Sequence, residues 1–478
     1  MVPKNCLLVV LTLMALLLSV NSALAAISTD STGFMRVRSV LLKGNYRTRD
    51  RIVLREMSLH VGDTIQLSAL PGRLAWDQRN INNTNLFVTV SVTAEQTPPL
   101  DTTQLTALDL TVTMKERWYF VAYPVFDIAD RNLNEWWYDR GHQFSRTIYG
   151  GRLSYKNVTG TNDRLQIEYV RGFLKKTVLS YSKPYIDRAQ KTGLRVDLGY
   201  LTNNEIPYRT QADKWLYTKS EQILRERTYA GLTVTNRRGL YHYHSVEARY
   251  TRTTIADTIA RLNPDYFLNS QTRQQYLTLS YGYRFDRRDN VAYPLQGTLF
   301  RGSVGLNGLL PADDYRFFEM TASVTRYWPL GGRFYGAGSL RGRLSWPERQ
   351  PYFNLRALGS STDMVRGYEL YVIDGQQFGI WRNSLRYQLF NTVRQLNWLK
   401  VRQFNTLPIA AYITAFGDAG YVKSNVAGQY QSQLANRILI GTGISLDLVT
   451  YYNLVFRLSG TVNGQGKTGL FFNLAQEL

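Results

Sequence analysis

The chain has 478 residues, a formal net charge of +21 and a single cysteine, and it is rich in tyrosine (33 residues) and glycine (36 residues). Beyond residue 26 it contains no run of 18 apolar residues, which excludes helical membrane spans. Its basic residues are spread along the chain without a basic helix or an RNA-binding motif, so we do not expect nucleic acid as a partner.

The first 26 residues have the features of a secretory signal peptide. Lys4 supplies a short positive segment, residues 7–20 are almost all apolar, and Ala23-Leu24-Ala25 is a cleavage site of the A-x-A type. Because Cys6 lies within this segment, we expect the exported chain to contain no cysteine, and therefore neither disulfides nor thiolate chemistry.

Residues 36–116 are expected to form a small domain of order β-α-α-β-β, a length that can bury a modest core. Turn residues separate its segments, and the apolar residues recur with a strand period in some segments and with a helical period in others. The predicted elements are a strand near 37–42, a helix with Thr48 as its N-cap, a helix over 68–82, and strands near 86–93 and 107–114 on either side of Pro98-Pro99.

From Arg117 to the C-terminus the apolar residues recur with a period of two, which indicates β-strands. Over 277–285, for example, leucine, tyrosine and phenylalanine fall on one face, and threonine, serine, glycine and arginine on the other. A soluble sandwich alternates in the same way, but the even number of strands and their connections favour a transmembrane barrel over residues 117–478. We predict sixteen strands, near 117–126, 145–156, 163–171, 176–184, 191–202, 226–236, 242–253, 274–285, 297–306, 316–328, 333–345, 379–390, 408–417, 436–447, 452–460 and 467–475.

The connections between these strands have the lengths that an outer-membrane barrel requires. One alternate set is mostly short, as expected at the periplasmic side, and the other contains the long loops, the longest being 346–378. Two periplasmic links, 286–296 and 391–407, are longer than this rule expects. Basic side chains could face a wet lumen and the loops, or anionic lipopolysaccharide at the outer surface.

Several short motifs lie at corresponding places of one known family. They are Lys43-Gly44-Asn45, Val61-Gly62-Asp63 and residues 85–90 in the small domain, Asp286-Arg287-Arg288-Asp289 with Pro294 and Gly297 after the eighth strand, Leu358-Gly359-Ser360 and Val365-Arg366-Gly367-Tyr368 in the longest loop, and residues 416–420 in the thirteenth strand. On these motifs the mature chain resembles the BamA/TamA superfamily of outer-membrane assembly factors, also called the bacterial surface antigen family. The resemblance implies one periplasmic polypeptide-transport-associated (POTRA) domain followed by a sixteen-stranded outer-membrane barrel.

The resemblance also implies a role for the longest loop. In the family the loop arginine reaches back into the lumen and pairs with acidic groups on the wall, so Arg366 would pair with Asp418, beside Phe416. A guanidinium can form two parallel hydrogen bonds with a carboxylate, and a confined lumen screens the pair less than bulk water does. Relatives often carry a glutamate where this chain has Leu385, so the sequence leaves a second acidic partner unidentified.

The barrel is expected to close by pairing its first strand with its last, across a weak seam. Pro124 cannot donate a ladder hydrogen bond in the first strand, and glycines such as Gly469 loosen the last one. Residues 467–474, with Gly469 and Phe472, resemble the polar-x-Gly-x-x-aromatic-x-hydrophobic signal by which barrel proteins are recognised for insertion. An ordinary terminal strand shares most of these features.

No catalytic, cofactor or metal site is indicated. His242 and His244 share a strand face, but no third ligand accompanies them. No Ser-His-acid set or pair of carboxylates stands out, and the glycine pairs are not followed by a helix, as a phosphate loop would be.

We therefore expect an outer-membrane protein assembly or translocation factor rather than an enzyme. The small domain would capture unfolded outer-membrane or secreted clients by strand addition, and the seam between 117–126 and 467–475 would open toward the bilayer. The expected partners are these clients and outer-membrane lipid or lipopolysaccharide, and periplasmic accessory proteins could bind as well. A passive pore with a basic lumen and a translocator for one surface or secreted protein remain as alternatives.

Overall fold

The computed structural model describes residues 33–97, 105–131, 134–360, 363–396, 398, 405–450 and 454–475. The predicted signal peptide, Cys6 and the Pro98-Pro99 turn lie outside the described residues. Within the described ranges, no helix is both long enough and apolar enough to cross a membrane.

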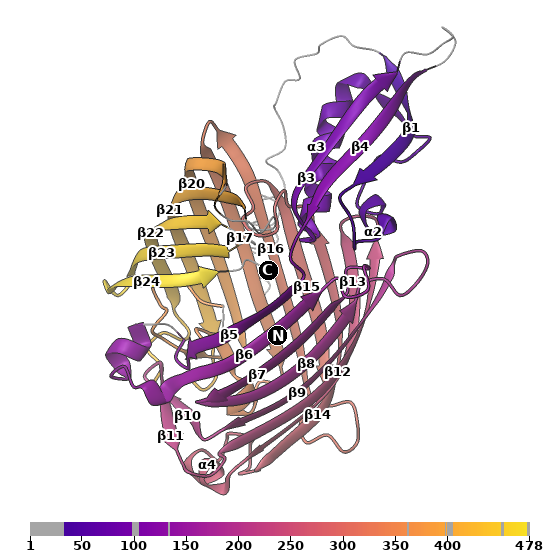
Figure 1. The fold of residues 1–478 in the computed structure, drawn as a ribbon. Helices are drawn as coiled ribbons and strands as arrows, with labels where there is room; N and C mark the ends of the chain where they lie inside the picture. The colour runs from indigo at the N-terminus through magenta and orange to yellow at the C-terminus, as the bar shows by residue number, and fades with distance from the viewer. Residues whose placement is uncertain are drawn as a thin grey trace, which may run out of the picture.

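A four-stranded domain stands at one end of a large curved sheet of sixteen strands (Figure 1). The strand order in the small domain is β2-β1-β4-β3, with β1 parallel to β4. The predicted order of strands and helices is confirmed, and the short strand β2 is an addition. Its elements are β1 (Phe34–Lys43), α2 (Asp50–Leu54), β2 (Thr64–Gln66), α3 (Leu70–Asn83), β3 (Phe87–Thr97) and β4 (Thr106–Glu116).

The prediction that Thr48 caps the first helix is wrong. Helix α2 begins at Asp50, and Arg49 stands at the cap position without a side-chain hydrogen bond. The Thr48 hydroxyl donates instead to Glu116 Oε1 at 2.7 Å, and it accepts from Nδ2 of Asn157, the residue after a strand of the large sheet, at 2.9 Å. A contact between the two parts of the chain therefore replaces the local cap.

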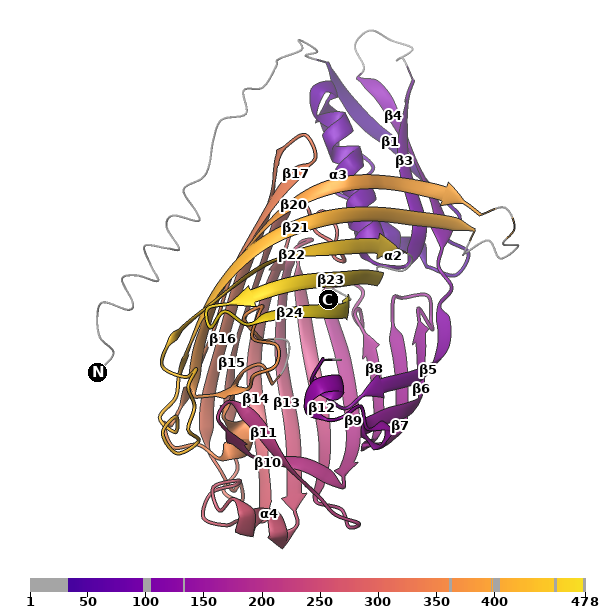
Figure 2. The same ribbon diagram turned by 90° about the vertical axis from the view of Figure 1, so that its left-hand side faces the viewer.

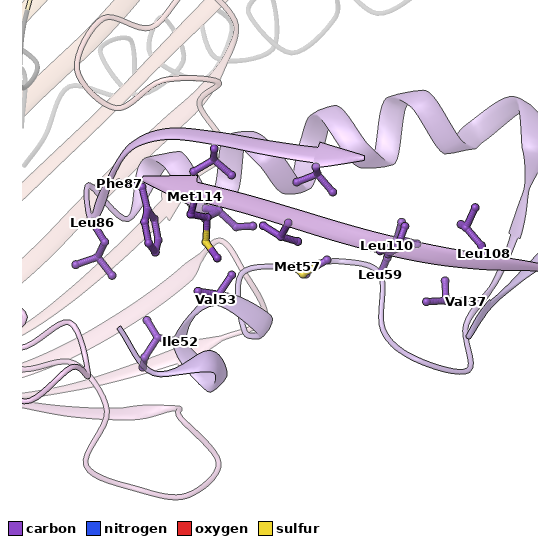
Figure 3. Packing of buried hydrophobic residues seen from close by; sticks show 14 of the residues in the cluster. Val37, Ile52, Val53, Met57, Leu59, Leu86, Phe87, Leu108, Leu110 and Met114 are labelled. Carbon is purple, nitrogen blue, oxygen red and sulfur yellow. The ribbon is translucent and has the colours of Figure 1, made fainter. Parts of the chain in front are cut away.

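The core of the small domain forms around the central strand β4. Leu108 and Leu110, which are fully buried, and Met114 lie on one face of this strand with the expected period of two. Ile52 of α2 packs into the same cluster (Figure 3), to which Ile81 of α3 also belongs.

The sixteen strands of the large sheet are antiparallel, and their order in the sheet follows their order in the sequence. All sixteen predicted strands are confirmed. They are β5 (Phe120–Ile128), β6 (Thr147–Lys156), β7 (Arg164–Gly172), β8 (Leu174–Lys183), β9 (Thr192–Asn203), β12 (Arg225–Arg238), β13 (His242–Ile255), β14 (Arg273–Asp286), β15 (Gly297–Asn307), β16 (Phe317–Gly331), β17 (Phe334–Trp346), β20 (Gln377–Gln395), β21 (Thr406–Lys423), β22 (Ile438–Thr450), β23 (Leu454–Asn463) and β24 (Thr468–Ala475).

The two faces of the large sheet differ in the way that a barrel wall in lipid requires. Leu279 and Tyr281 of β14 are 42% and 46% exposed, as expected for side chains that face lipid. The opposite face lines a cavity of about 480 Å³ with polar groups, among them Ser280, Glu319 and Arg343. The apolar outer face and polar inner face identify the interior as a hydrated lumen.

The long loops at the end opposite the small domain contain secondary structure that the sequence pattern did not predict (Figure 2). Apolar side chains from several of these loops form a buried cluster, in which Tyr266 and Tyr352 are completely buried. These loops contain the hairpin β10 (Glu205–Gln211) and β11 (Lys214–Lys219), helix α4 (Asp257–Leu262), and the short pair β18 (Arg356–Leu358) and β19 (Ile373–Asp374).

The sheet ends at β5 on one side and at β24 on the other (Figures 1 and 2). Among the described residues no ladder joins these two strands, so the expected pairing of the first strand with the last is not formed in this structure. The other expected feature of the seam is present, because Pro124 lies within β5, where an edge strand tolerates a residue without an N–H group.

Candidate functional site

The longest loop, between β17 and β20, folds against the inner side of the wall. Val365 and Tyr368 are 1% and 4% exposed, and they belong to a buried cluster with Phe378, Ile380 and Val422 of strands β20 and β21. Two of the four motif residues that the sequence singled out, Val365 and Tyr368, are therefore buried against the wall.

Arg366 and Asp418 form the predicted pair. Arg366 Nε donates to Asp418 Oδ2 at 2.7 Å and Arg366 Nη2 to Asp418 Oδ1 at 2.5 Å. The Asp418 side chain is completely buried, and the guanidinium lies 3.8 Å from the centre of the Phe416 ring. Two charge-assisted hydrogen bonds and a ring face therefore surround this arginine.

Glycines on the wall make room for the loop backbone. A Cβ atom at Gly441 of β22 would lie 1.7 Å from the Arg366 carbonyl oxygen, and one at Gly420 of β21 would lie 2.4 Å from a Val365 methyl group. Gly367 has a φ of +96°, which favours glycine at the tip. Gly420 lies within a motif evident in the sequence, whereas Gly441 carries no sequence signal, because its role depends on a partner 75 positions away.

The second acidic group near Arg366 is Glu369, which the sequence analysis did not identify. Its Oε2 accepts from the Gly367 N–H at 2.8 Å, and Leu385, at the family's glutamate position, is 47% exposed. Burial raises the pKa of Glu369 to about 6, although its hydrogen bonds and the Arg366 charge act in the opposite direction. The acid is thus placed in the loop itself, one residue beyond the motif.

The same loop contacts residues on both sides of the seam. Arg131, which follows β5, donates to the Gly359 and Tyr371 carbonyl oxygens at 3.0 and 2.7 Å. At the other side, Asn463 Nδ2 at the end of β23 donates to the Gly367 carbonyl oxygen at 2.9 Å. The sequence carried no signal for either residue, because each acts through backbone groups of a distant segment.

One further contact crosses the seam directly. Asn134, also beyond β5, donates from Nδ2 to the Leu470 carbonyl oxygen of β24 at 2.6 Å. Pro124 and Phe472 are both exposed, and Phe472 is 55% exposed on the outer face of β24. Gly469 lies beneath the Phe471 ring, which a Cβ atom there would approach to 2.4 Å.

The small domain has an edge strand of its own. β3 stands at the end of the sheet order and pairs only with β4 among the described residues. Thr89, Ser91 and Thr93 along it are exposed. An edge strand of this kind presents N–H and C=O groups that can pair with another extended segment.

The histidines that share a strand face lie away from these features. His242 Nδ1 is 2.8 Å from the Tyr283 hydroxyl, and His244 Nδ1 is 2.8 Å from the Tyr281 hydroxyl. Among the residues that the structure describes, no group of three or more histidine, cysteine or acidic side chains could hold a metal ion.

The chain matches one family model and resembles many solved structures, two of which are given below. The family model described as the Omp85 superfamily domain matches residues 157–451, more than half of the chain. BamA from Haemophilus ducreyi lacking POTRA domains 1–3 is 16% identical, with a TM-score of 0.51 over 92% of this chain and 83% of that one. CdiB from Escherichia coli is 11% identical, with a TM-score of 0.51 over 96% and 92%. At these identities the likeness concerns the fold, and a search of curated protein sequences finds no match.

Proposed function

The chain belongs to the Omp85 superfamily of outer-membrane assembly and translocation factors, which are not enzymes, and from this premise we propose that it delivers clients through its open seam. It resides in the bacterial outer membrane with the small domain in the periplasm. In the proposed mechanism an unfolded client first adds a strand to the small domain. It then pairs with the free sheet edges and passes sideways into the bilayer.

The single observation that supports this mechanism is the pair of free edges, β5 and β24. Each offers a row of backbone N–H and C=O groups, over nine residues in β5 and eight in β24. In lipid, such groups carry a large cost unless they are paired. A client strand that pairs with them would therefore gain hydrogen bonds and a template for its own register.

A passive pore agrees less well with the outer loops. A pore needs an open outer mouth, whereas the loops over this end are held together by the buried cluster that contains Ile206, Ile259, Tyr266, Tyr352 and Tyr430. In addition, Arg131 attaches the longest loop to the segment after β5. Lateral exit at the seam avoids this barrier.

Translocation through the lumen is the second candidate, and the polar inner wall favours it. Asp197 and Arg249 are paired there at 2.7 Å, and Ser280, Glu319 and Arg343 line the cavity described above. A hydrated route of this kind would suit an extended secreted client. The two candidates differ in whether the seam must open.

A disulfide across the seam separates them. We would introduce Val121→Cys and Phe471→Cys, together with neighbouring pairs, and follow assembly of clients with and without reductant. A control pair, Ala248→Cys and Leu279→Cys, lies directly opposite on β13 and β14, so it joins strands that are already paired. We expect the seam disulfide to abolish membrane assembly, reductant to restore it, and the control pair to have no effect. Assembly that continues in the locked protein would refute lateral delivery, and continued secretion alone would support the lumen route.

A further inference from the structure

The periplasmic turn between β14 and β15, residues 287–296, is longer than its neighbours and is braced internally. Arg288 and Asp286 form two hydrogen bonds of 2.8 Å. Asp289 Oδ1 accepts from three backbone N–H groups, those of Asn290, Leu295 and Gln296, at 2.8 to 3.1 Å. These contacts fix the turn as one rigid unit.

One side of this turn is anchored among the C-terminal strands. Tyr293 is 4% exposed, and its hydroxyl donates to Asp447 Oδ2 of β22 at 2.8 Å. Its ring stacks on Tyr412 of β21, with centroids 4.6 Å apart. Arg386 of β20 lies 4.5 Å from the same ring and donates to the Pro294 carbonyl oxygen at 2.7 Å.

This anchor extends toward the edge of the sheet. The completely buried Asp447 also accepts two hydrogen bonds from Arg457 of β23, at 2.8 and 3.0 Å. β23 is the only strand between β22 and the edge strand β24. The Asp447 carboxylate therefore links the Tyr293 hydroxyl to β23, the strand that pairs with β24.

The other side of the turn is attached to the small domain. Asn83, the last residue of α3, donates from Nδ2 to the Arg288 and Asp289 carbonyl oxygens, both at 3.3 Å. Its Oδ1 accepts from the Val291 N–H at 3.2 Å. A cavity of about 380 Å³ lies beside these contacts, bounded by α3, the turn and strands β20 to β22. The turn therefore has both an attachment to the small domain and space in which to move.

We propose that the turn 287–296 is a coupling strap, in which Tyr293 is the positioning residue that links the small domain to the C-terminal edge of the sheet. A rigid element with two attachments transmits a displacement at one end to the other. When a client displaces the small domain, Asn83 moves the turn, and Tyr293 then alters the position of β22 and β23. This role rests on the proposed function, because movement of the edge strand β24 matters only if clients are delivered at the seam.

The test measures the edge directly and uses no client. The folded full-length protein would carry spin labels at Gln96→Cys on β3 and Leu470→Cys on β24, both of which are exposed. The only native cysteine, Cys6, lies in the predicted signal peptide. The variants are Tyr293→Phe, which removes only the hydroxyl, Asn83→Ala, and the two together. Tyr315→Phe is the control, because it removes a single tyrosine hydrogen bond, to the Arg349 carbonyl oxygen at 2.9 Å, between two loops far from this turn.

We expect Tyr293→Phe and Asn83→Ala each to broaden the distribution of distances between the two labels at least twofold. The distance distribution of the double variant should be no broader than those of the single variants, because both substitutions break the same connection. Three results would each overturn the coupling. They are an unchanged distance distribution in Asn83→Ala, a double variant whose broadening equals the sum of the single ones, and a broadening by Tyr315→Phe as large as that by Tyr293→Phe. If Tyr293→Phe fails to fold, Asn83→Ala alone decides the test with the same expectation. Failure of the proposed function would appear separately, as client assembly that survives the seam disulfide while these distances still respond.

Discussion

The two edges of the sheet face the same opening but are supported differently. Behind the C-terminal edge, strands β20 to β23 carry the longest loop and buried ion pairs, and the inward side chain Phe471 of β24 is 4% exposed. At the N-terminal edge, the inward side chains Val121 and Tyr123 of β5 are both 39% exposed. The seam is therefore asymmetric. The C-terminal edge is packed against the strands behind it and would move together with them, whereas the N-terminal edge is packed less tightly.

Removal of Arg366 should have the largest effect, because it leaves Asp418 buried without its strongest partner. Arg366→Ala should lower the free energy of unfolding by roughly 3–5 kcal/mol, as is typical for a broken buried pair, and should expose the loop to protease. Urea unfolding of the folded barrel would measure it. The control is Arg349→Ala in the same loop, whose side chain is 72% exposed and 3.9 Å from its acidic partner. Equal losses in the two variants would contradict a supporting role for the buried pair.

Truncation of the two inward aromatic side chains tests the asymmetry itself. Phe471→Ala should cost about 3–5 kcal/mol, because it empties a buried site. Tyr123→Ala should cost less than half as much, because this side chain is already 39% exposed; its hydroxyl accepts a hydrogen bond from Arg152 Nη1 at 3.1 Å. Hydrogen exchange of β5 and β24 in each variant would locate the loss. A larger effect of Tyr123→Ala would contradict tighter packing at the C-terminal edge.

Acidity should strengthen the docking of the loop through Glu369. Its pKa is raised from 4.5 to about 6 by burial, so the docked loop binds the proton more tightly than the released loop does. The resulting stability is fully present below pH 4.5 and is lost as the pH rises through 6, a change on the order of 2 kcal/mol. Protease cleavage of the loop should therefore be slower at pH 5 than at pH 7.5. Glu369→Gln should abolish this difference, and a pH effect that persists in this variant would assign it to another group.

The sequence predicted the wall better than the contacts across it. Each of the sixteen strands repeats an apolar–polar period over its own length, and this local signal is sufficient to locate it. The pair of Arg366 and Asp418 was predicted because both residues lie in motifs that resemble a family. Arg131, Asn134 and Asn83 had no such signal, since each donates to backbone groups of a segment that only the fold brings near.

The predicted pairing of the first strand with the last is not formed among the described residues, and it could not have been read from local pattern for a related reason. Strand composition identifies β5 and β24 as edge strands, but whether they pair depends on the curvature of fourteen intervening strands and on loops such as the one containing Asn134. The local sequence pattern carries no information about the combined effect of this curvature and these loops. The loop hairpin β10 and β11 was missed because its seven- and six-residue strands lie in a region that the barrel pattern assigns to a connection.

The smallest expected effect lies on the N-terminal side, at the luminal ion pairs of β6 to β8. Glu168 contacts Arg152 at 3.0 Å and Lys176 at 2.6 Å, but the Arg152 and Lys176 side chains are 36% and 25% exposed. Water and salt in the lumen screen such pairs, so Glu168→Gln should cost no more than about 1 kcal/mol. The matched change Asp447→Asn, at a completely buried carboxylate on the C-terminal side, should cost several times as much. Urea unfolding at low and high salt would compare them, because screening should reduce only the effect at Glu168. If the two variants lose equal stability with equal salt dependence, the wall is supported evenly and the asymmetry of the seam must arise from the edge strands alone.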